Sequence, residues 1–490
     1  MERPNAWQTY SADQLEELER ITGDYRAFIS DNKTEREACA SAVELARAAG
    51  YVDLADCVRD GRTVHPGDKV YAVNRGKSLL LAVIGREGLE HGVNILGAHI
   101  DSPRLDIKQN PLDERDGLAY LDTHYYGGIN TYQWVTLPLA IHGVVARKDG
   151  SVVTVAVGED PADPVFAITD ILPHLGREQA EKKAGDFIDG EMLDLLVGSR
   201  PLADGAEKKD GAAPDGTDAD TADTVSAGAA SADTAGADRP VASFFLKVVA
   251  DKLGCDEEDF LSAELEVVPA GRAREMGADR SMILGYGQDD RVCAYTSLLA
   301  QLACEAPERT AVTLLVDKEE IGSVGATGMT SRFFENTMAE LMELAGVSGD
   351  LALRRCLAGS RMLSSDVSAA FDPEFAGVFE KKNSAFLGHG LAFNKFTGAR
   401  GKSGSNDADA EYVAYIRRVM DEGGVHYQTC ELGRVDAGGG GTIAYILAKY
   451  GMQVIDCGVP VLSMHAPWEV TSKADVYEAY RGYVAFLATK

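Results

Sequence analysis

The sequence has few cysteines and no long apolar run. Its eight cysteines are scattered over 490 residues, and none forms a CxxC pair. Small secreted domains that depend on disulfides carry a dense cysteine framework, so this pattern excludes that class and predicts reduced, mostly buried thiols. The longest apolar run, Leu79 to Ile84, is far shorter than the roughly 20 residues that cross a bilayer, and residues 1–20 contain no apolar signal segment. We therefore expect a cytoplasmic protein without a membrane partner.

Basic residues are also scarce relative to acidic ones. Lys and Arg number 48 against 77 Asp and Glu, which gives a formal net charge of -29. Such a charge repels phosphate backbones, so nucleic acid is not an expected partner. The hydrophobic content is 45%, and a chain of 490 residues with this content buries more apolar surface than one core holds. At least two domains are expected.

Large apolar residues are nearly absent from residues 203–238, which consist almost wholly of Ala, Asp, Gly, Thr and Ser. Val225 is the one large apolar residue in this segment. Burial there cannot offset the entropy of ordering the chain, so a disordered, acidic low-complexity loop is predicted. Its simplest interpretation is a solvated insertion without a function of its own.

The apolar pattern of the remaining chain predicts an α/β fold with an insertion. Helical spacing over 11–49 begins at the candidate N-cap Ser11. Short apolar runs within 70–101 then predict strands that are buried on both faces. Residues 119–157 alternate and contain turn signals, which indicates a separate β-rich unit, and helix and strand signals alternate again from 241 onward. These patterns predict a mixed, mostly parallel sheet between helices, interrupted by the β-rich insertion.

Polar residues gather at the predicted strand ends, where open α/β sheets place their ligand sites. Five such ends stand out: His99 with Asp101, Asp289 with Asp290, Glu319 with Glu320, Asp366, and His465. Histidine and carboxylate are ligand types of zinc, and a shared carboxylate can bridge two ions. A single histidine at a strand end is more often a hydrogen-bonded structural residue, whereas the joint pattern predicts a metal site. Asp289 and Asp290 also precede an apolar helical run, so an N-cap role competes with a ligand role.

At two of these strand ends, a pair of nearby polar residues can divide the work between metal binding and a supporting or catalytic role. His99 and Asp101 lie on one face of a strand end, so Asp101 can orient the imidazole; the alternative is a turn aspartate before Pro103. Glu319 and Glu320 point in different directions, so one can bind metal while the other takes a proton from a metal-bound water. In isolation, the same pair is typical of a solvated helix start.

Five motifs together resemble the aspartyl aminopeptidase family, a group of dinuclear zinc metallo-aminopeptidases. They are GAHIDSPRLDIK, GQDDR, VDKEEIGSVGA, SSDVSAA and VLSMHAPWEV, in the family's order and at compatible spacings. The resemblance runs over nearly the whole chain and implies a metallopeptidase catalytic domain that hydrolyses the N-terminal residue from peptides. It also implies two divalent metal ions as cofactors, with zinc in the first place and Co2+ or Mn2+ as alternatives.

The resemblance implies a role for each residue of the strand-end set. The implied metal ligands are two pairs and one bridging residue: His99 with Asp366, Glu320 with His465, and Asp289 between the two ions. Glu319 is then the general base that activates a metal-bridging water. Asp101 matches the aspartate that supports the first histidine.

The resemblance also implies the domain order and the assembly. The family carries a β-rich dimerisation domain after the HxDSP strand, which here gives a catalytic domain in two parts, 1–107 and 241–490, around an insertion at 108–240. Family members assemble from dimers into a dodecamer with an enclosed chamber, so we expect a homo-oligomer that admits peptide substrates. The segment ITDILPHLGRE resembles the stretch whose histidine reaches a neighbouring active site, which makes His174 a candidate substrate contact.

The preferred first residue of the substrate stays open, because the family contains members that prefer acidic residues and relatives that cleave neutral ones. Lys395, Arg400 and Lys402 can form a pocket for an acidic side chain, or they can be solvated loop cations. Two other functions also stay open. One is another dinuclear amidohydrolase of the same fold that acts on acylated amino acids, and the other is a non-catalytic oligomeric shell.

Overall fold

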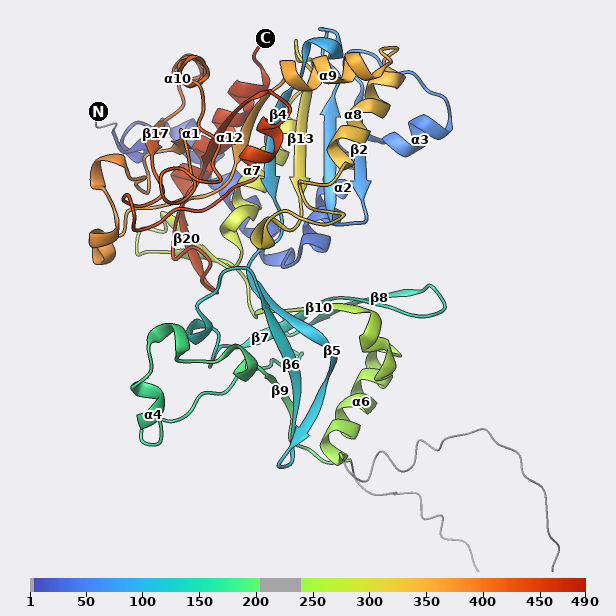
Figure 1. The fold of residues 1–490 in the computed structure, drawn as a ribbon, viewed down its shortest axis with the longest axis vertical. Helices are drawn as coiled ribbons and strands as arrows, with labels where there is room; N and C mark the ends of the chain where they lie inside the picture. The colour runs from blue at the N-terminus through green and yellow to red at the C-terminus, as the bar shows by residue number, and fades with distance from the viewer. Residues whose placement is uncertain (1–3, 203–238) are drawn as a thin grey trace, which may run out of the picture. The chain divides into compact units, whose positions relative to one another are not determined.

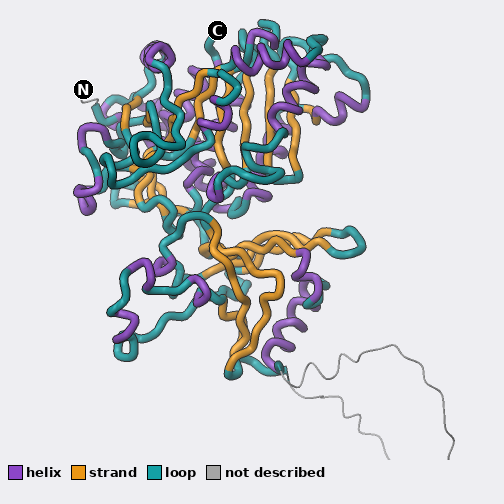
Figure 2. Tube along the Cα trace, in the orientation of Figure 1, coloured by secondary structure: helices purple, strands orange, loops and turns teal. Residues whose placement is uncertain are grey.

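The computed structural model describes residues 4–202 and 239–490, and it divides into two compact units. The first unit contains Met1–Arg104, Tyr125–Gln133 and Val268–Lys490, and the second contains Leu105–His124 and Trp134–Val267. Helices and strands alternate along the first unit, whereas the second is built mainly of strands and loops (Figures 1 and 2). The acidic loop predicted at 203–238 lies outside the described residues.

The first unit contains a nine-stranded sheet in the order β1-β2-β3-β13-β4-β14-β18-β16-β17. Its strands are β1 Val52–Asp53, β2 Lys69–Asn74, β3 Ser78–Val83, β4 Asn94–His99, β13 Ala311–Val316, β14 Arg361–Ser365, β16 Leu391–Asn394, β17 Tyr427–Cys430 and β18 Gln453–Gly458. The central strands β13, β4, β14 and β18 are parallel to one another, whereas β3 is antiparallel to both of its neighbours. The predicted mixed, mostly parallel sheet is confirmed.

Helices of the first unit pack against both faces of this sheet. They are α1 Ala12–Asp31, α2 Glu35–Ala48, α3 Leu54–Arg59, α7 Gln288–Leu302, α8 Phe333–Leu344, α9 Asp350–Gly359, α10 Ala410–Glu422, α11 Ala444–Ala448 and α12 Lys473–Leu487. Helices α1, α2, α7, α10 and α12 contribute to one hydrophobic cluster, and α3, α8, α9 and α11 contribute to a second. Successive residues of β3 alternate between them: Leu79 and Leu81 join the first, Leu80 and Ala82 the second. This double burial explains why the strand reads as a continuous apolar run.

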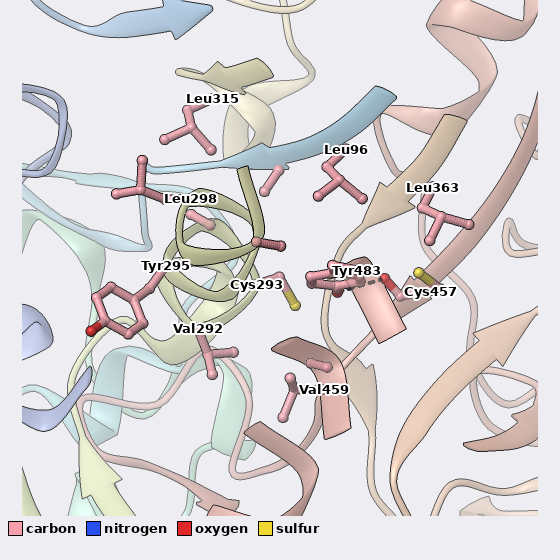
Figure 3. Packing of buried hydrophobic residues seen from close by; sticks show 14 of the residues in the cluster. Leu96, Val292, Cys293, Tyr295, Leu298, Leu315, Leu363, Cys457, Val459 and Tyr483 are labelled. Atoms are coloured by element: carbon pink, nitrogen blue, oxygen red, sulfur yellow. Dashed lines mark hydrogen bonds between the residues drawn. The ribbon is translucent and has the colours of Figure 1, made fainter. Parts of the chain in front are cut away.

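Figure 3 shows part of the first cluster, in which side chains of α7 gather with side chains of the central strands. Leu298 of α7, Leu96 of β4 and Leu315 of β13 are at most 2% exposed. Burial of each leucine contributes roughly 1.5–3 kcal/mol. The hydroxyl of Tyr483 in α12 donates a hydrogen bond to the carbonyl of Cys457 at 3.5 Å (Figure 3). Apolar packing therefore fixes α7, which carries Asp289 near its start, against the sheet.

The predicted start of the first helix is confirmed by its capping contacts. The side chain of Ser11 accepts a hydrogen bond from the backbone N–H of Gln14, and the Gln14 side chain accepts one from the backbone N–H of Ser11. This reciprocal pair satisfies two N–H groups that the first turn of a helix leaves without partners. Thr34 and Glu37 form the same capping box at the start of α2.

A five-stranded sheet of the first unit has the order β11-β12-β20-β19-β15. Its strands are β11 Arg274–Met276, β12 Met282–Gly285, β15 Ser368–Ala369, β19 Pro460–Leu462 and β20 Glu469–Ser472. β12 and β20 pair antiparallel, with Gly285 opposite Glu469. This register brings the first residue of β20 close to the segment from which α7 begins.

The second unit is built on a six-stranded sheet in the order β8-β7-β10-β5-β6-β9. Its strands are β5 Arg104–Arg115, β6 Leu118–Tyr126, β7 Leu139–Ala146, β8 Val152–Val157, β9 Leu195–Gly198 and β10 Ala263–Pro269, and its helices are α4 Arg177–Ala180 and α6 Pro240–Leu253. The unit ends at Val267 rather than at the expected boundary of 240. The reason is that α6 contacts β9 and that Glu266 and Val267 of β10 pair with Asp106 and Leu105 of β5.

The state of the cysteines agrees with the sequence. All eight are free thiols, and all except Cys304 are buried. Among the residues that the structure describes, no helix combines the length and the apolar character needed to cross a membrane.

Candidate metal centre

The strand-end residues of the first unit meet at one edge of the nine-stranded sheet. His99 is the last residue of β4, Glu319 and Glu320 begin the short 3-10 helix η7 (Glu319–Ile321) after β13, and Asp366 follows β14. Since β13, β4 and β14 are parallel neighbours, their carboxyl ends lie at the same edge. Asp289 comes from the first turn of α7, and His465 lies in the loop between β19 and β20.

Asp289 lies between the two histidines. Its Oδ1 is 3.2 Å from Nε2 of His99, and its Oδ2 is 3.2 Å from Nε2 of His465. The outer carboxylates are slightly farther away: Asp366 Oδ1 is 4.0 Å from His99 Nε2, and Glu320 Oε2 is 3.6 Å from His465 Nε2. The geometry thus forms two groups that share Asp289, each with ligand atoms within 4.8 Å of one another.

The residues alone left an N-cap role and a ligand role open for Asp289 and Asp290, and the family resemblance implied Asp289 as the ligand. Asp289 faces the two imidazoles, whereas Oδ2 of Asp290 accepts a hydrogen bond from the backbone N–H of His99 at 3.4 Å. A third group of ligand atoms within 4.8 Å of one another contains His99, Glu319 and Glu320. The glutamate pair therefore borders the same space as the histidine–aspartate set.

Asp101 contacts three residues of this set, namely His99, Glu319 and Glu320. Nδ1 of His99 is 3.0 Å from the backbone carbonyl of Asp101 and 3.3 Å from its Oδ1. Oδ1 of Asp101 accepts a hydrogen bond from the backbone N–H of Glu319 at 3.1 Å, and Oδ2 of Asp101 accepts one from the backbone N–H of Glu320 at 3.2 Å. With Nδ1 engaged, His99 presents Nε2 to Asp289, as an imidazole ligand fixed by its other nitrogen does.

Two buried residues that contact the centre were missed by sequence reasoning. The hydroxyl of Tyr126, the last residue of β6, donates a hydrogen bond to Asp101 Oδ2 at 2.8 Å. The sequence showed this tyrosine only as part of a turn signal before Gly127. Burial and Asp101 raise the pKa of Tyr126, so the phenol keeps the proton that it donates.

Glu469 is the second missed residue and is 1% exposed. Its Oε1 accepts the backbone N–H of His465 at 2.8 Å, and its Oε2 accepts that of Asp289 at 3.1 Å. One carboxylate thus ties two ligand-bearing segments together. The motif VLSMHAPWEV contains Glu469, but nothing in the motif alone indicates that its side chain reaches a residue 180 positions earlier.

Glycines give the chain close access to the centre. The carbonyl of Gly128 lies 2.8 Å from Nδ1 of His465, so this nitrogen is engaged and Nε2 faces the carboxylates. A Cβ on Gly128 would lie 3.3 Å from that Nδ1, and one on Gly127 would lie 3.2 Å from Glu320. Gly127 also has a φ of +76°, which a side chain would strain. The bend at these glycines therefore packs directly on His465 and Glu320.

The carboxyl groups at this edge outnumber the two histidines, so two imidazolium charges could not balance the negative charge of all these carboxylates. Burial raises the pKa of Glu319 to about 7, and Asp289 and Asp101 add to the shift. Burial likewise raises the pKa of Glu320 and of Asp366 well above the ordinary value of a carboxyl group. A divalent cation favours the charged forms of such carboxylates.

Asp289 differs from these carboxylates. Burial opposes its ionisation, but hydrogen bonds from His465 and His99 lower its pKa well below the usual range. For His465, burial alone would lower the pKa, but the hydrogen bond and the negative charge of Asp289 have a larger effect and raise the pKa to about 10. Imidazole nitrogen and carboxylate oxygen both offer lone pairs to a metal, so a cation at this edge would compete with a proton for His465.

The donor set fits divalent metal ions. Oε1 of Glu320 is buried and accepts no hydrogen bond from the described residues. A buried charge without a partner costs several kcal/mol, and a cation supplies that partner. Nitrogen and oxygen donors in groups of three, with room for water, are typical of catalytic zinc sites.

The remaining predicted residues lie outside this cluster. His174 is exposed on a turn of the second unit, before α4. Lys395 follows β16, is 46% exposed and forms an ion pair with Asp407. Nζ of Lys402 binds the other oxygen of Asp407 at 2.8 Å.

The sequence profile described as "Aminopeptidase I zinc metalloprotease (M18)" matches residues 28–487. The chain belongs to this M18 family, and it is accordingly a hydrolase that acts on peptides as a zinc-dependent aminopeptidase. The family resemblance and the α/β fold expected from the sequence are confirmed.

Individual relatives cover nearly the whole chain. A probable M18 family aminopeptidase 1 of Clostridium acetobutylicum is 55% identical over 486 residues, which is 99% of this chain and 98% of the relative. The crystal structure of an M18 family aminopeptidase from Thermotoga maritima matches with a TM-score of 0.88 and 40% identity, covering 99% of each chain. A dodecamer structure of mApe1 from yeast shares the fold, with a TM-score of 0.72 and 20% identity over 96% of this chain and 97% of that one.

Proposed function

We propose that this aminopeptidase binds two divalent metal ions, with zinc in the first place, and uses Glu319 as the general base that releases the first residue of a peptide. The observation that carries the proposal is the position of Asp289, whose two oxygens each lie 3.2 Å from a different histidine. A carboxylate shared in this way is suited to bridge two ions.

The proposed ligands follow from the two groups of ligand atoms. His99 and Asp366 would hold one ion, Glu320 and His465 would hold the other, and Asp289 would serve both; the mutual distances within these two groups support this assignment. Asp101 and Glu469 bind no metal in this proposal. They hold the ligand-bearing backbone through the hydrogen bonds described above.

When bound, divalent ions supply Lewis acidity that makes both water and a peptide carbonyl more reactive. Glu319 accepts the proton of the attacking water on its carboxylate and then donates it to the leaving amine nitrogen. Its backbone N–H is held by Asp101 at 3.1 Å, which fixes where the carboxylate can reach. Glu319 and Glu320 are adjacent in η7, so one turn of the chain would provide both a base and a ligand.

An acidic preference at the first substrate residue is supported by the charge around Asp407. Lys395 and Lys402 both pair with this carboxylate, and their hydrogen bonds lower its pKa. Two ammonium groups on one carboxylate leave a net positive charge, which attracts a further carboxylate. We include Lys395 as the substrate contact on this basis.

Further parts of the proposal concern the assembly. The second unit, with its β-rich sheet, is proposed as the dimerisation domain, and the dimers are proposed to form a dodecamer, the assembly named for the yeast structure. His174, exposed on that unit, contacts substrate bound by a neighbouring subunit. The compartment is proposed to be the cytoplasm, in agreement with the free thiols.

A substrate panel with metal control tests the proposal. The zinc-loaded chain is assayed on Asp-, Glu-, Leu- and Lys-p-nitroanilides and on their N-acetylated forms, before and after chelation and after return of Zn2+, Co2+ or Mn2+. We expect release only from free amino groups, loss on chelation and recovery with metal. Cleavage of the acetylated compounds instead would indicate an amidohydrolase, and a chain that binds no metal would indicate a non-catalytic shell.

A further inference from the structure

Tyr126 is the residue with the most direct unexplained contact to the centre. It is 8% exposed, and its hydroxyl lies 2.8 Å from Asp101 Oδ2. Neither the metal ligands nor the general base of the proposed function includes this tyrosine. The inference below rests on that function, because it concerns how the glutamate pair is held.

Three hydrogen-bond donors approach the two carboxylate oxygens of Asp101, and Nδ1 of His99 lies 3.3 Å from Oδ1. Oδ1 accepts the backbone N–H of Glu319, while Oδ2 accepts both that of Glu320 and the hydroxyl of Tyr126. The terminal torsion of an aspartate side chain is broad, so its carboxylate can rotate unless its partners restrain it. The two N–H groups belong to the turn η7, which Asp101 has to position. Tyr126 comes from a different part of the chain, so its hydroxyl can restrain Asp101 independently of that turn.

The ring of Tyr126 is itself fixed. The guanidinium of Arg104 lies over it, 3.9 Å from the ring centroid. Arg104 forms an ion pair with Glu35 at 3.6 Å, and Glu35 also pairs with Lys77 at 3.1 Å. A cation over an aromatic face attracts the ring, and these buried charges hold the cation in place. The hydroxyl is thus presented to Asp101 from a rigid support.

We propose that Tyr126 is a positioning residue that acts through Asp101. Its hydroxyl holds the Asp101 carboxylate in the rotation at which Oδ1 receives Glu319 and Oδ2 receives Glu320. Asp101 in turn holds η7, so Glu319 and Glu320 stay in the positions that the proposed reaction needs. The phenol itself touches neither substrate nor metal.

The chain offers a matched control in Tyr286. It is 3% exposed, its hydroxyl donates to the backbone carbonyl of Pro103 at 3.0 Å, and the Arg291 guanidinium lies 5.2 Å from its ring centroid. Tyr126→Phe and Tyr286→Phe therefore each remove one buried tyrosine hydroxyl near the same strand end. Only the first removes a donor to Asp101.

The test compares both variants as the full-length, zinc-loaded chain. For Tyr126→Phe we expect kcat to fall about tenfold with KM within about twofold, since a hydrogen bond to a charged acceptor is lost from the reactive arrangement. We also expect zinc to pass to a chelator about tenfold faster, because the Glu320 turn and His99 are held less firmly. Tyr286→Phe should leave both quantities within about twofold of the parent chain.

The outcomes separate this inference from the proposed function. Equal kcat and equal zinc release in Tyr126→Phe and the parent chain would overturn the inference while leaving the aminopeptidase intact. A parent chain inactive on every aminoacyl substrate would refute the function, and the zinc-release comparison would still decide on Tyr126. In an Asp101→Asn background, Tyr126→Phe should add no further loss; additive losses would show that the tyrosine acts by another route.

Discussion

Glu319→Gln separates proton transfer from metal binding. Glutamine has nearly the shape of glutamate but cannot accept the proton of the attacking water. The backbone N–H of Glu319 that bonds to Asp101 at 3.1 Å is unaffected by the change. The turn that presents Glu320 is therefore expected to stay in place, and the variant should keep its zinc.

The expected fall in kcat of Glu319→Gln is the part of the rate that a general base contributes. General acid–base catalysis contributes about 100- to 10,000-fold, which corresponds to about 3–5 kcal/mol of activation free energy. Because Glu319 would act both in the attack and in proton return to the leaving amine, we place the loss in kcat in the upper half of this range, at about 1,000-fold or more. KM should change by less than about threefold, since the side chain makes no proposed ground-state contact.

The assay pairs this variant with its neighbour. Zinc content is measured by elemental analysis and kcat on the preferred aminoacyl p-nitroanilide for Glu319→Gln and Glu320→Gln. The first should retain zinc and lose turnover, and the second should lose zinc, because Glu320 Oε2 lies 3.6 Å from His465 Nε2 as a proposed ligand. Glu319→Gln with full zinc and near-parental kcat would refute the assignment of the base.

Three further predictions concern specificity, packing and pH. Lys395→Met should lower kcat/KM for acidic first residues about tenfold and leave neutral ones unchanged, because one of the two ammonium groups near Asp407 is removed; an equal loss on leucine substrates would contradict this. Leu298→Ala, at a side chain that is 0% exposed, should reduce the free energy of unfolding by about 2–5 kcal/mol in urea titrations. Burial raises the pKa of Asp456 to about 7, so the folded chain binds more protons than the unfolded chain between the unfolded pKa, about 4, and 7. The contribution of Asp456 to stability should fall as pH rises through this window, so Asp456→Asn should make the slope of unfolding free energy against pH less negative than that of the parent chain between pH 4 and 7 under the same zinc conditions.

Local sequence signals were sufficient for the elements that depend on near neighbours. Ser11 and Gln14 are three positions apart, so the capping box of α1 is readable from the sequence alone. The run at 79–84 predicted a doubly buried strand because β3 has helices on both faces. The strand-end histidines and carboxylates predicted a metal site because parallel strands end at one edge of a sheet.

Contacts between distant segments depended on the tertiary structure. The position of Asp289 between the histidines depends on how α7 starts beside β4, which periodicity and spacing alone do not specify, although the motif resemblance implied it. The extent of the second unit, with β10 between β7 and β5, likewise follows from strand pairing over more than 100 residues.

The sequence by itself therefore determined which chemistry is present: its residue types, their strand-end placement and their motifs define an M18 metallo-aminopeptidase. The tertiary structure decided which residues hold that chemistry in place. Tyr126 and Glu469 are far in sequence from Asp101 and Asp289, and their side chains meet Asp101 and the Asp289 backbone only because the first unit folds these segments together. A single hydrogen bond leaves no periodic pattern in a sequence, so such support is visible only once the chain is folded.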